Sequence, residues 1–236
     1  MPAEGRVLTD LKPGEVILPR MLEDPLVCPD LVGRILARPV ESGGVVTDED
    51  MHLSKGPSYV PFYEYLERPG AVERIVDLDR RTFEEMGHDF SDHPWNEENF
   101  RFEVPGKADL SFVAVGEDEF VGFFIASERV PGEAHGHRIV LEPKWRTGRM
   151  ALQLWCAYWR VAAAQSRIML LTGEVGTANR TMRRFLEMLG FQPLDEEQTR
   201  DYLDKRGREE KLEGVEMIGE DGARSIAMIL RLRDPA

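Results

Sequence analysis

Residues 141–151 read Leu-Glu-Pro-Lys-Trp-Arg-Thr-Gly-Arg-Met-Ala, a short polar turn between two apolar segments. The pattern from Arg138 to Phe191 predicts a strand, this turn, a long helix, a second strand, a shorter helix and a closing Gly-Phe. The first turn of a helix has backbone N–H groups without partners inside the helix, and the positive end of the helix dipole adds to their attraction for anions. A strand that leads into such a turn therefore predicts a site for a phosphate or pyrophosphate.

Composition limits the class of protein. The chain has 236 residues, 42% of them hydrophobic, which is typical of one large domain or of a domain with an extension. No apolar run approaches the roughly 20 residues that cross a bilayer, and the first residues lack the pattern of a signal peptide, so we expect a cytoplasmic protein with no membrane partner. The two cysteines, Cys28 and Cys156, have the spacing of neither a metal site nor a disulfide framework, and Cys156 is predicted to be a buried thiol.

The net charge of −13 argues against nucleic acid as a partner, because binding to a phosphate backbone needs a basic face. An amine or a basic peptide would be attracted to an acidic surface. The same charge also keeps a protein soluble, so charge alone does not choose between these explanations.

Turn signals divide the chain into an extension at 1–57 and a main domain at 58–236. The extension has short apolar runs and is predicted to pack on the main domain. From residue 58 onward the periodicity predicts a strand at 58–66, a helix at 71–87, a short helix before Phe100, strands at 110–115, 120–127 and 135–141, a helix at 150–165, a strand at 167–174, a helix at 178–189, and a closing hairpin at 215–218 and 225–232.

Two of these segments have unusual composition. The segment 150–165 is apolar nearly all round, so it is predicted to be buried between the sheet and the extension or at the interface of a homodimer. The segment 195–213 is densely charged and is predicted to be a solvated helix or lid inserted before the last strands. In the helix at 178–189, Thr177 is predicted to cap the start and Gly190 to end it.

The order of elements over residues 58–232 resembles the GNAT acyltransferase superfamily, whose members transfer an acyl group from coenzyme A to an amine. Residues 141–146 are similar to the family's hydrophobe-x-Pro-x-x-Arg strand end, and residues 146–151 to its pyrophosphate loop, Arg-x-x-Gly-x-Gly/Ala. Asn179 followed by Gly190-Phe191 is similar to its second half, and residues 93–100 to a loop of protein N-terminal acetyltransferases. The resemblance implies an α/β (α+β) fold, with a mixed, largely antiparallel sheet flanked by helices and splayed between its fourth and fifth core strands.

The resemblance also implies acetyl-coenzyme A as the cosubstrate and assigns residues to it. The backbone N–H groups of the turn would hold the pyrophosphate, the main chain of β-strand residues would pair with the pantetheine arm, and an amide on the second helix would contact the arm. An alternative role for that amide, Asn179, is a simple helix cap. The implied cofactor-binding residues are Val140, Leu141, Arg146, Thr147, Gly148, Arg149, Met150, Ala151 and Asn179.

Two positions depart from the family pattern. The expected loop glycine is Arg149, whose side chain either points away or contacts a phosphate itself. If it fills the loop instead, the pyrophosphate site is blocked. The tyrosine that often protonates the leaving thiolate corresponds to Leu186, so another group or water would have to supply that proton.

The attacking amine must lose a proton, so a base is required. Some family members use a carboxylate on the strand before the loop, and the matching position is His135. Because side chains alternate along a strand, His135, His137, Ile139 and Leu141 are expected to share one face. We predict His135 or His137 as the base or proton relay, with Glu174 as a further candidate, against the alternative that both histidines lie in an exposed hairpin. No third ligand has clear spacing, so no metal is expected.

These features predict an N-acyltransferase in which an amine of a small molecule or protein attacks the thioester directly, with an acidic rim that gathers a cationic acceptor. The alternative is a catalytically degenerate member of the same fold that acts as a binding or structural module, for which Arg149 and Leu186 argue.

Overall fold

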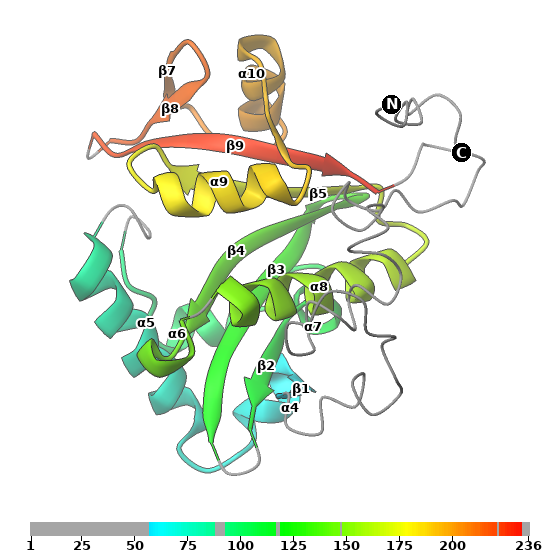
Figure 1. The fold of residues 1–236 in the computed structure, drawn as a ribbon. Coiled ribbons are helices and arrows are strands. Elements are labelled where there is room, and N and C mark those ends of the chain that lie inside the picture. Colours follow the sequence, from blue (N-terminus) through cyan, green and yellow to red (C-terminus); the bar gives the residue numbers. More distant parts are fainter. Residues whose placement is uncertain (1–56, 88–92, 117–118, 147, 221, 233–236) are drawn as a thin grey trace, which may run out of the picture.

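The computed structural model describes residues 57–87, 93–116, 119–146, 148–220 and 222–232 (Figure 1). The described helices are α4 (Phe62–Leu66), α5 (Ala71–Met86), α6 (Glu97–Arg101), α7 (Lys107–Leu110), the 3₁₀ turn η3 (Pro143–Trp145), α8 (Gly148–Ala164), α9 (Arg180–Met188) and α10 (Glu196–Asp204). The described strands are β1 (Ser58–Pro61), β2 (Phe112–Val115), β3 (Phe120–Val130), β4 (Glu133–Leu141), β5 (Leu170–Gly176), β6 (Gln192–Pro193), β7 (Lys211–Glu213), β8 (Glu216–Ile218) and β9 (Arg224–Arg231).

These strands form one sheet in the order β1-β2-β3-β4-β5-β9-β8-β7, with β6 paired to β9. Every neighbouring pair is antiparallel except β4 and β5, which are parallel. Their pairing runs only from Glu133–Gly136 on β4 to Leu170–Gly173 on β5. Beyond these residues both strands continue but no longer pair with each other. The predicted mixed sheet with a splay between its central strands is therefore confirmed.

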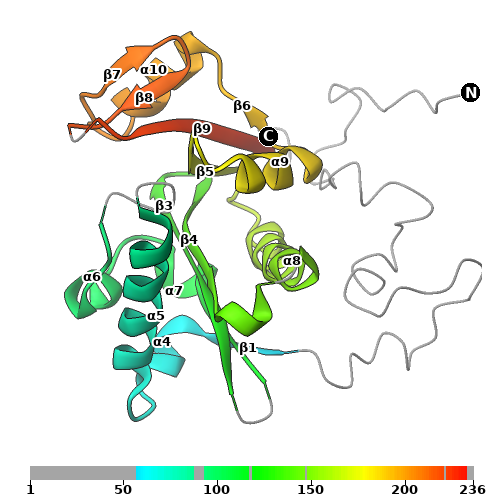
Figure 2. The same cartoon turned by 60° about the vertical axis from the view of Figure 1, so that its left-hand side comes forward.

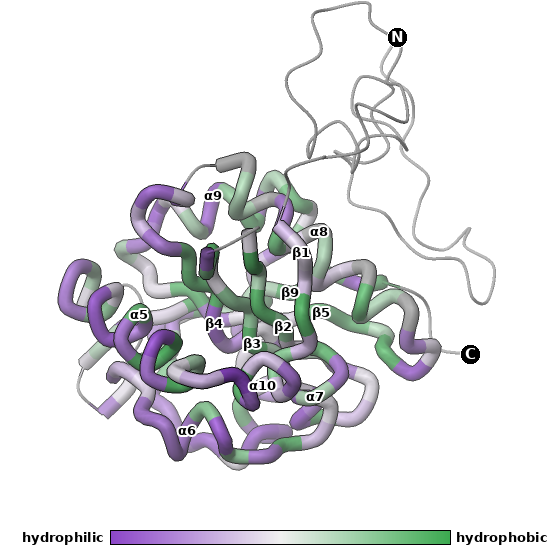
Figure 3. Tube along the Cα trace, turned by 90° about the horizontal axis from the view of Figure 1, so that it is seen from below, coloured by the Kyte–Doolittle hydropathy of each residue, from purple (hydrophilic) through white to green (hydrophobic). Residues whose placement is uncertain are grey.

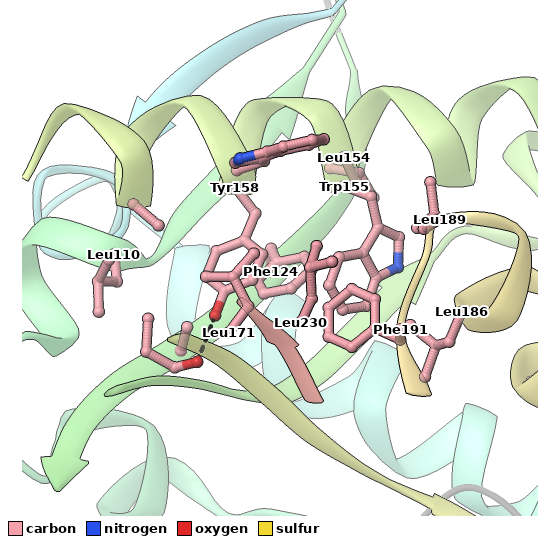
Figure 4. Packing of buried hydrophobic residues seen from close by; sticks show 14 of the residues in the cluster. Leu110, Phe124, Leu154, Trp155, Tyr158, Leu171, Leu186, Leu189, Phe191 and Leu230 are labelled. Atoms are coloured by element: carbon pink, nitrogen blue, oxygen red, sulfur yellow. Dashed lines mark hydrogen bonds between the residues drawn. The ribbon is translucent and has the colours of Figure 1, made fainter. Parts of the chain in front are cut away.

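Helices cover both faces of the sheet. Figure 2 shows the central strands β3 and β4 between α8 on one side and α5 on the other. On the α8 face, Leu154, Trp155 and Tyr158 pack against Phe124 of β3, and the Tyr158 hydroxyl donates to the Ala134 carbonyl (2.9 Å) (Figure 4). On the opposite face α4, α5 and α6 bury their own apolar cluster against β2 and β3. Figure 3 shows apolar residues concentrated on the central strands.

Several predicted boundaries shift for local reasons. The expected strand at 58–66 ends at Pro61, because α4 begins at Phe62. Leu110 belongs to α7, and β5 begins at Leu170 rather than at residue 167. The start of α9 is capped by Asn179, whose side chain accepts from the Met182 N–H (3.0 Å), so the prediction of Thr177 as the cap is wrong.

The charged segment at 195–213 does not form a solvated lid. Its helix α10 begins with a capping box at Asp195 and buries Thr199, Tyr202 and Leu203 against the sheet. Only its outer face is charged, so composition alone concealed an amphipathic helix.

Some predictions fall outside the described residues. These include the extension at 1–57, of which only residue 57 is described, Cys28, and the side chain of Cys156. In the part of the chain that is described, no helix is both long and apolar enough to cross a membrane.

Candidate active site

The separation of β4 from β5 opens the centre of the sheet, and a cavity lies on each side of the opening. One cavity, of about 190 Å³, is largely apolar and lies toward α8 and α9. The other, of about 360 Å³, is polar and lies toward α10 and β9. Both are lined by Gly136, His137, Arg138, Glu174 and Gly176, so the two cavities meet where the strands part.

A β-bulge in β4 sets the direction of its side chains at this point. Ile125 of β3 pairs with Arg138 and Ala126 with Gly136, which leaves His137 as an extra residue. His135, His137 and Arg138 therefore all face the polar side, whereas Ile139 and Leu141 pack toward α8. The prediction that His135, His137, Ile139 and Leu141 share one face is wrong, because simple alternation does not hold across a bulge.

The apolar cavity is a slot between β4 and α9. Its walls include Phe124, Trp155, Met182 and Leu186. Along one side runs the edge of β4 beyond Gly136, which faces the separated β5 and has no strand paired to it among the described residues. A strand edge of this kind can accept an extended amide-containing chain as if it were another strand.

The polar cavity has a different lining. Five arginines (129, 138, 206, 208 and 224) line it with His93, His135 and His137, and the acids that line it are Glu174 and Glu210. The predicted acidic rim is therefore not found around this cavity: the negative charge of the chain lies elsewhere.

His135 is held at the floor of the polar cavity by hydroxyl groups. Its Nδ1 lies 3.0 Å from the Thr172 Oγ1 and 3.3 Å from the Tyr202 hydroxyl oxygen. The Thr172 hydroxyl donates to Glu133 and the Tyr202 hydroxyl donates to Glu174, each at 2.7 Å. Since each hydroxyl has one hydrogen, already directed to a carboxylate, both oxygens can only accept from the imidazole. Nδ1 therefore carries the hydrogen, and Nε2 is left with a lone pair.

The electrostatics of the site keep both histidines neutral. Burial, with the repulsion of Arg129 and Arg208, lowers the pKa of His135 to about 4 against the opposing attraction of Glu174. Burial likewise holds the pKa of His137 well below its usual value, and its Nε2 lies 2.7 Å from the Ser127 hydroxyl. His135 is only 8% exposed, so the alternative that it lies in an exposed hairpin is wrong.

Glu174 links the histidine to α10 and the segment after it. Besides accepting from Tyr202, its carboxylate forms an ion pair with Arg208. Burial raises the pKa of this carboxyl, but the charge that His135 gains at about pH 4 and the attraction of Arg208 outweigh it and hold the pKa below its usual range. Glu174 therefore remains a carboxylate, with its oxygens engaged in positioning neighbouring groups.

The neutral state of His135 makes stability depend on pH. Unfolded histidine gains a proton below about pH 6.5, whereas His135 stays neutral until about pH 4, so stability present above pH 6.5 is lost as the pH falls. Between pH 7 and pH 5 this one group should lower the free energy of unfolding by about 2 kcal/mol. Urea denaturation at both pH values should show a smaller loss in His135→Gln, and an equal loss in both proteins would contradict the burial of a neutral imidazole.

The predicted cofactor-binding residues are only partly brought together. Leu141, Ala151 and Asn179 line the apolar cavity with Val140, and Met150 is buried in the first turn of α8. The side chain of Arg146 lines the same cavity but is bound to the Leu141 carbonyl (2.9 Å), to Thr82 (3.1 Å) and to Glu85, so it ties the turn to α5. Thr147 and the side chain of Arg149 lie outside what the structure describes.

Sequence reasoning missed the groups that surround His135. Thr172 directly precedes Gly173, the last residue of β5 that pairs with β4. Tyr202 belongs to α10, a helix whose charged composition predicted exposure to solvent. Arg138 and Asp79 form a buried ion pair (3.4 Å) that connects the bulge to α5. The only signal in the sequence was Asp79 itself, a carboxylate between buried positions of an amphipathic helix.

Comparison with known proteins identifies the fold family. Residues 72–191, just over half of the chain, match the model of the acetyltransferase (GNAT) family. The chain belongs to the GNAT family. This agrees with the resemblance in the sequence, and it supports acetyl-coenzyme A as the cosubstrate of an N-acetyltransferase in general terms.

Solved GNAT structures share the fold at low sequence identity. The ribosomal-protein-S18-alanine N-acetyltransferase from Escherichia coli is 15% identical, with a TM-score of 0.51 over 76% of this chain and 96% of that protein. Ard1 from Thermoplasma volcanium is 12% identical, with a TM-score of 0.53 over 75% and 99%. A chain of the NatC complex bound to Gag peptide and CoA is 13% identical, with a TM-score of 0.54 over 75% and 98%. A search among curated proteins finds no match.

Proposed function

We propose that the protein is an N-acetyltransferase in which acetyl-coenzyme A occupies the apolar cavity and an amine enters from the polar cavity. The observation that carries the proposal is that the two cavities meet at the gap between β4 and β5, beside His135, His137 and Glu174. Two reactants that approach through opposite cavities are held next to each other without sharing a binding surface, which lowers the entropic cost of their encounter.

The residues of the apolar cavity fit the proposed cosubstrate. The main chain of Val140 and Leu141 borders the slot and would pair with the pantetheine arm. The first turn of α8, from Gly148 to Ala151, would direct its N–H groups at the pyrophosphate. Asn179 lines the slot from the start of α9. When bound, acetyl-coenzyme A supplies the acetyl group as an activated thioester.

The residues of the polar cavity would deprotonate the acceptor. A neutral amine attacks the thioester carbonyl, a carbon–nitrogen bond forms and the carbon–sulfur bond breaks. The nitrogen becomes more acidic as its new bond forms, so even a weak base accepts its proton. Nε2 of His135 has the lone pair for this step, and the proton passes on to solvent. Thr172 contacts the imidazole directly, and Glu174 acts on it through the Tyr202 hydroxyl. Both are therefore positioning groups that orient the ring.

The leaving sulfur must also gain a proton. Leu186 lines the apolar cavity at the family's tyrosine position, and no tyrosine lines either cavity in the described chain. His137 lines both cavities, so it is placed to relay a proton, with water as the other source. This same absence favours the second candidate function, a module that binds coenzyme A without transferring the acetyl group.

Release of free thiol distinguishes the two functions. The protein is mixed with acetyl-coenzyme A and a panel of amines, and binding is followed separately by calorimetry. Thiol release that depends on an amine supports transfer. Binding without release supports the module, and an absence of binding at millimolar acetyl-coenzyme A contradicts both.

Asn179 provides a test of the cosubstrate side. Asparagine and aspartate cap helices about equally well, so Asn179→Asp should keep α9 intact and remove the amide N–H₂ that we assign to the cosubstrate. We expect acetyl-coenzyme A affinity to fall about 10-fold with unchanged thermal stability. Asn179→Ala should lose both affinity and about 1 kcal/mol of stability. Unchanged acetyl-coenzyme A affinity in Asn179→Asp would show that Asn179 only caps α9.

A further inference from the structure

The polar cavity is basic in a strongly acidic protein. Five arginines and two glutamates line it, while the whole chain has a net charge of −13. Concentrating one sign of charge in a cavity, against the sign of the surrounding surface, focuses the electrostatic potential there. The charge of the lining therefore indicates the sign of charge that a ligand of this cavity carries.

Four of the five arginines already have carboxylate partners. Arg138 pairs with Asp79, Arg206 with Glu133, Arg208 with Glu174 and Glu210, and Arg224 with Glu213 and Glu216. The carboxylates compensate the charges of these four arginines. The resulting ion pairs hold the walls of the cavity in place.

Arg129 differs from the other four. It is exposed and lines the cavity, and its guanidinium has no hydrogen bond or ion pair with any residue in the described part of the chain. It lies on β3 two residues after Ser127, which pairs with His135 across the strands. The register of β3 against β4 shifts between Ser127 and Val130, so strand alternation does not fix the direction of the Arg129 side chain. Its place in the lining of the cavity that also contains His135 puts it on the His135 side of the sheet.

The neighbourhood of Arg129 is repulsive to further positive charge. Burial, with the repulsion of Arg208 and Arg129, lowers the pKa of Arg206 to about 10. An anion placed beside Arg129 would relieve this repulsion, whereas a second cation would add to it.

We propose that the acceptor is an amine of metabolite size that also carries a carboxylate or a phosphate, and that Arg129 binds this anionic group. The inference rests on the proposed transfer function and names the class of acceptor. A guanidinium binds either anion through paired N–H groups, so Arg129 suits both. A volume of about 360 Å³ accommodates a small molecule of this kind.

The strand geometry places the two ends of such an acceptor. The amine must approach the gap beside His135, and the anion must reach toward Arg129. Ser127 lies opposite His135, and Arg129 is two residues further along β3, which is about 7 Å along a strand. The proposed acceptor therefore extends from the centre of the sheet along the β3 side of the cavity.

Matched pairs of amines test the charge requirement. We would compare β-alanine with 3-aminopropanamide, 4-aminobutyrate with 4-aminobutanamide, and O-phosphoethanolamine with ethanolamine. The first two pairs test a carboxylate and the third a phosphate. Two measurements are made on the full chain: thiol release with saturating acetyl-coenzyme A, and calorimetric binding of each amine to the complex with coenzyme A.

Variants then test the residue. We expect Arg129→Gln to lower kcat/KM for the anionic member of the preferred pair about 10- to 100-fold, mainly through KM, and to leave the neutral member unchanged. Arg129→Lys should recover part of the loss, because it restores charge without the paired geometry. Arg80→Gln, which removes the same charge from the exposed face of α5, serves as the control and should have no effect.

The outcomes separate this inference from the proposed function. Turnover without preference for anionic amines, or an equal effect of Arg129→Gln on both members of a pair, overturns the inference and leaves the transfer function standing. Binding of an anionic amine that Arg129→Gln abolishes, without turnover, supports Arg129 as the anion site of the cavity and removes the transfer function. No turnover and no binding across the panel overturns the inference.

Discussion

Replacing His135 with glutamine should lower kcat by about 10²- to 10⁴-fold, the range that a positioned general base contributes. Glutamine retains an amide N–H₂ to donate toward Thr172 and Tyr202, but it has no lone pair that accepts a proton at neutral pH. Acetyl-coenzyme A affinity, measured by calorimetry, should stay within about 3-fold of the original, because His135 lines the polar cavity and not the apolar one.

Two further histidine variants make this result interpretable. His93→Gln removes an exposed imidazole from the same cavity and should leave kcat unchanged. His137→Gln should lower kcat by less than His135→Gln if His137 only relays the proton of the leaving sulfur. An unchanged kcat in His135→Gln would remove His135 as the base, and a large loss in His137→Gln alone would transfer that role to His137.

Replacing Asp79 with leucine should destabilise the protein by about 3–5 kcal/mol, which is the usual cost of leaving one partner of a buried ion pair uncompensated. Asp79 is fully buried, lies 3.4 Å from Arg138 and accepts the Trp95 N–H at 2.7 Å. Arg138 in turn donates to the His93 carbonyl (2.7 Å) and lies over the Trp95 ring. The change therefore removes the support of the bulge in β4 and of the wall of the polar cavity.

A double-mutant cycle in urea denaturation isolates this coupling. Asp79→Leu combined with Arg138→Met removes both charges, so the double variant should lose clearly less stability than the sum of the single losses. Asp77→Leu, on the exposed face of the same helix, is the matched control and should change stability by no more than about 1 kcal/mol. Strictly additive losses would show that the buried pair does not act as a unit.

The sequence predicted the order of elements well because hydrophobic periodicity and turn residues are local signals. The strand-turn-helix from Arg138 to Ala151 and the meander before it follow from such patterns. The bulge at His137 could not be predicted, because it depends on how β3 and β4 register against each other. The contact of Tyr202 with His135 could not be predicted for a related reason. A few buried positions decide how a charged helix packs, and the overall composition of the segment does not show them.

The same limit applied to charge. A net charge of −13 describes the whole surface, but the proposed acceptor would meet only the lining of one cavity, where arginines gather from β3, β4, β9 and the segment after α10. The five arginines are spread from residue 129 to residue 224, so no short window of residues displays the cluster. Folding alone brings these guanidinium groups together.

The position of α10 has a consequence for how this protein could diversify. Its Tyr202 hydroxyl lies between His135 and Glu174, and Arg206 and Arg208 follow directly after the helix. Insertions or exchanges within this stretch would reshape acceptor preference without touching α8, α9 or the slot beside β4. Evolution of a new acceptor preference can therefore act on this one short stretch, while the cavity proposed for the cosubstrate stays the same.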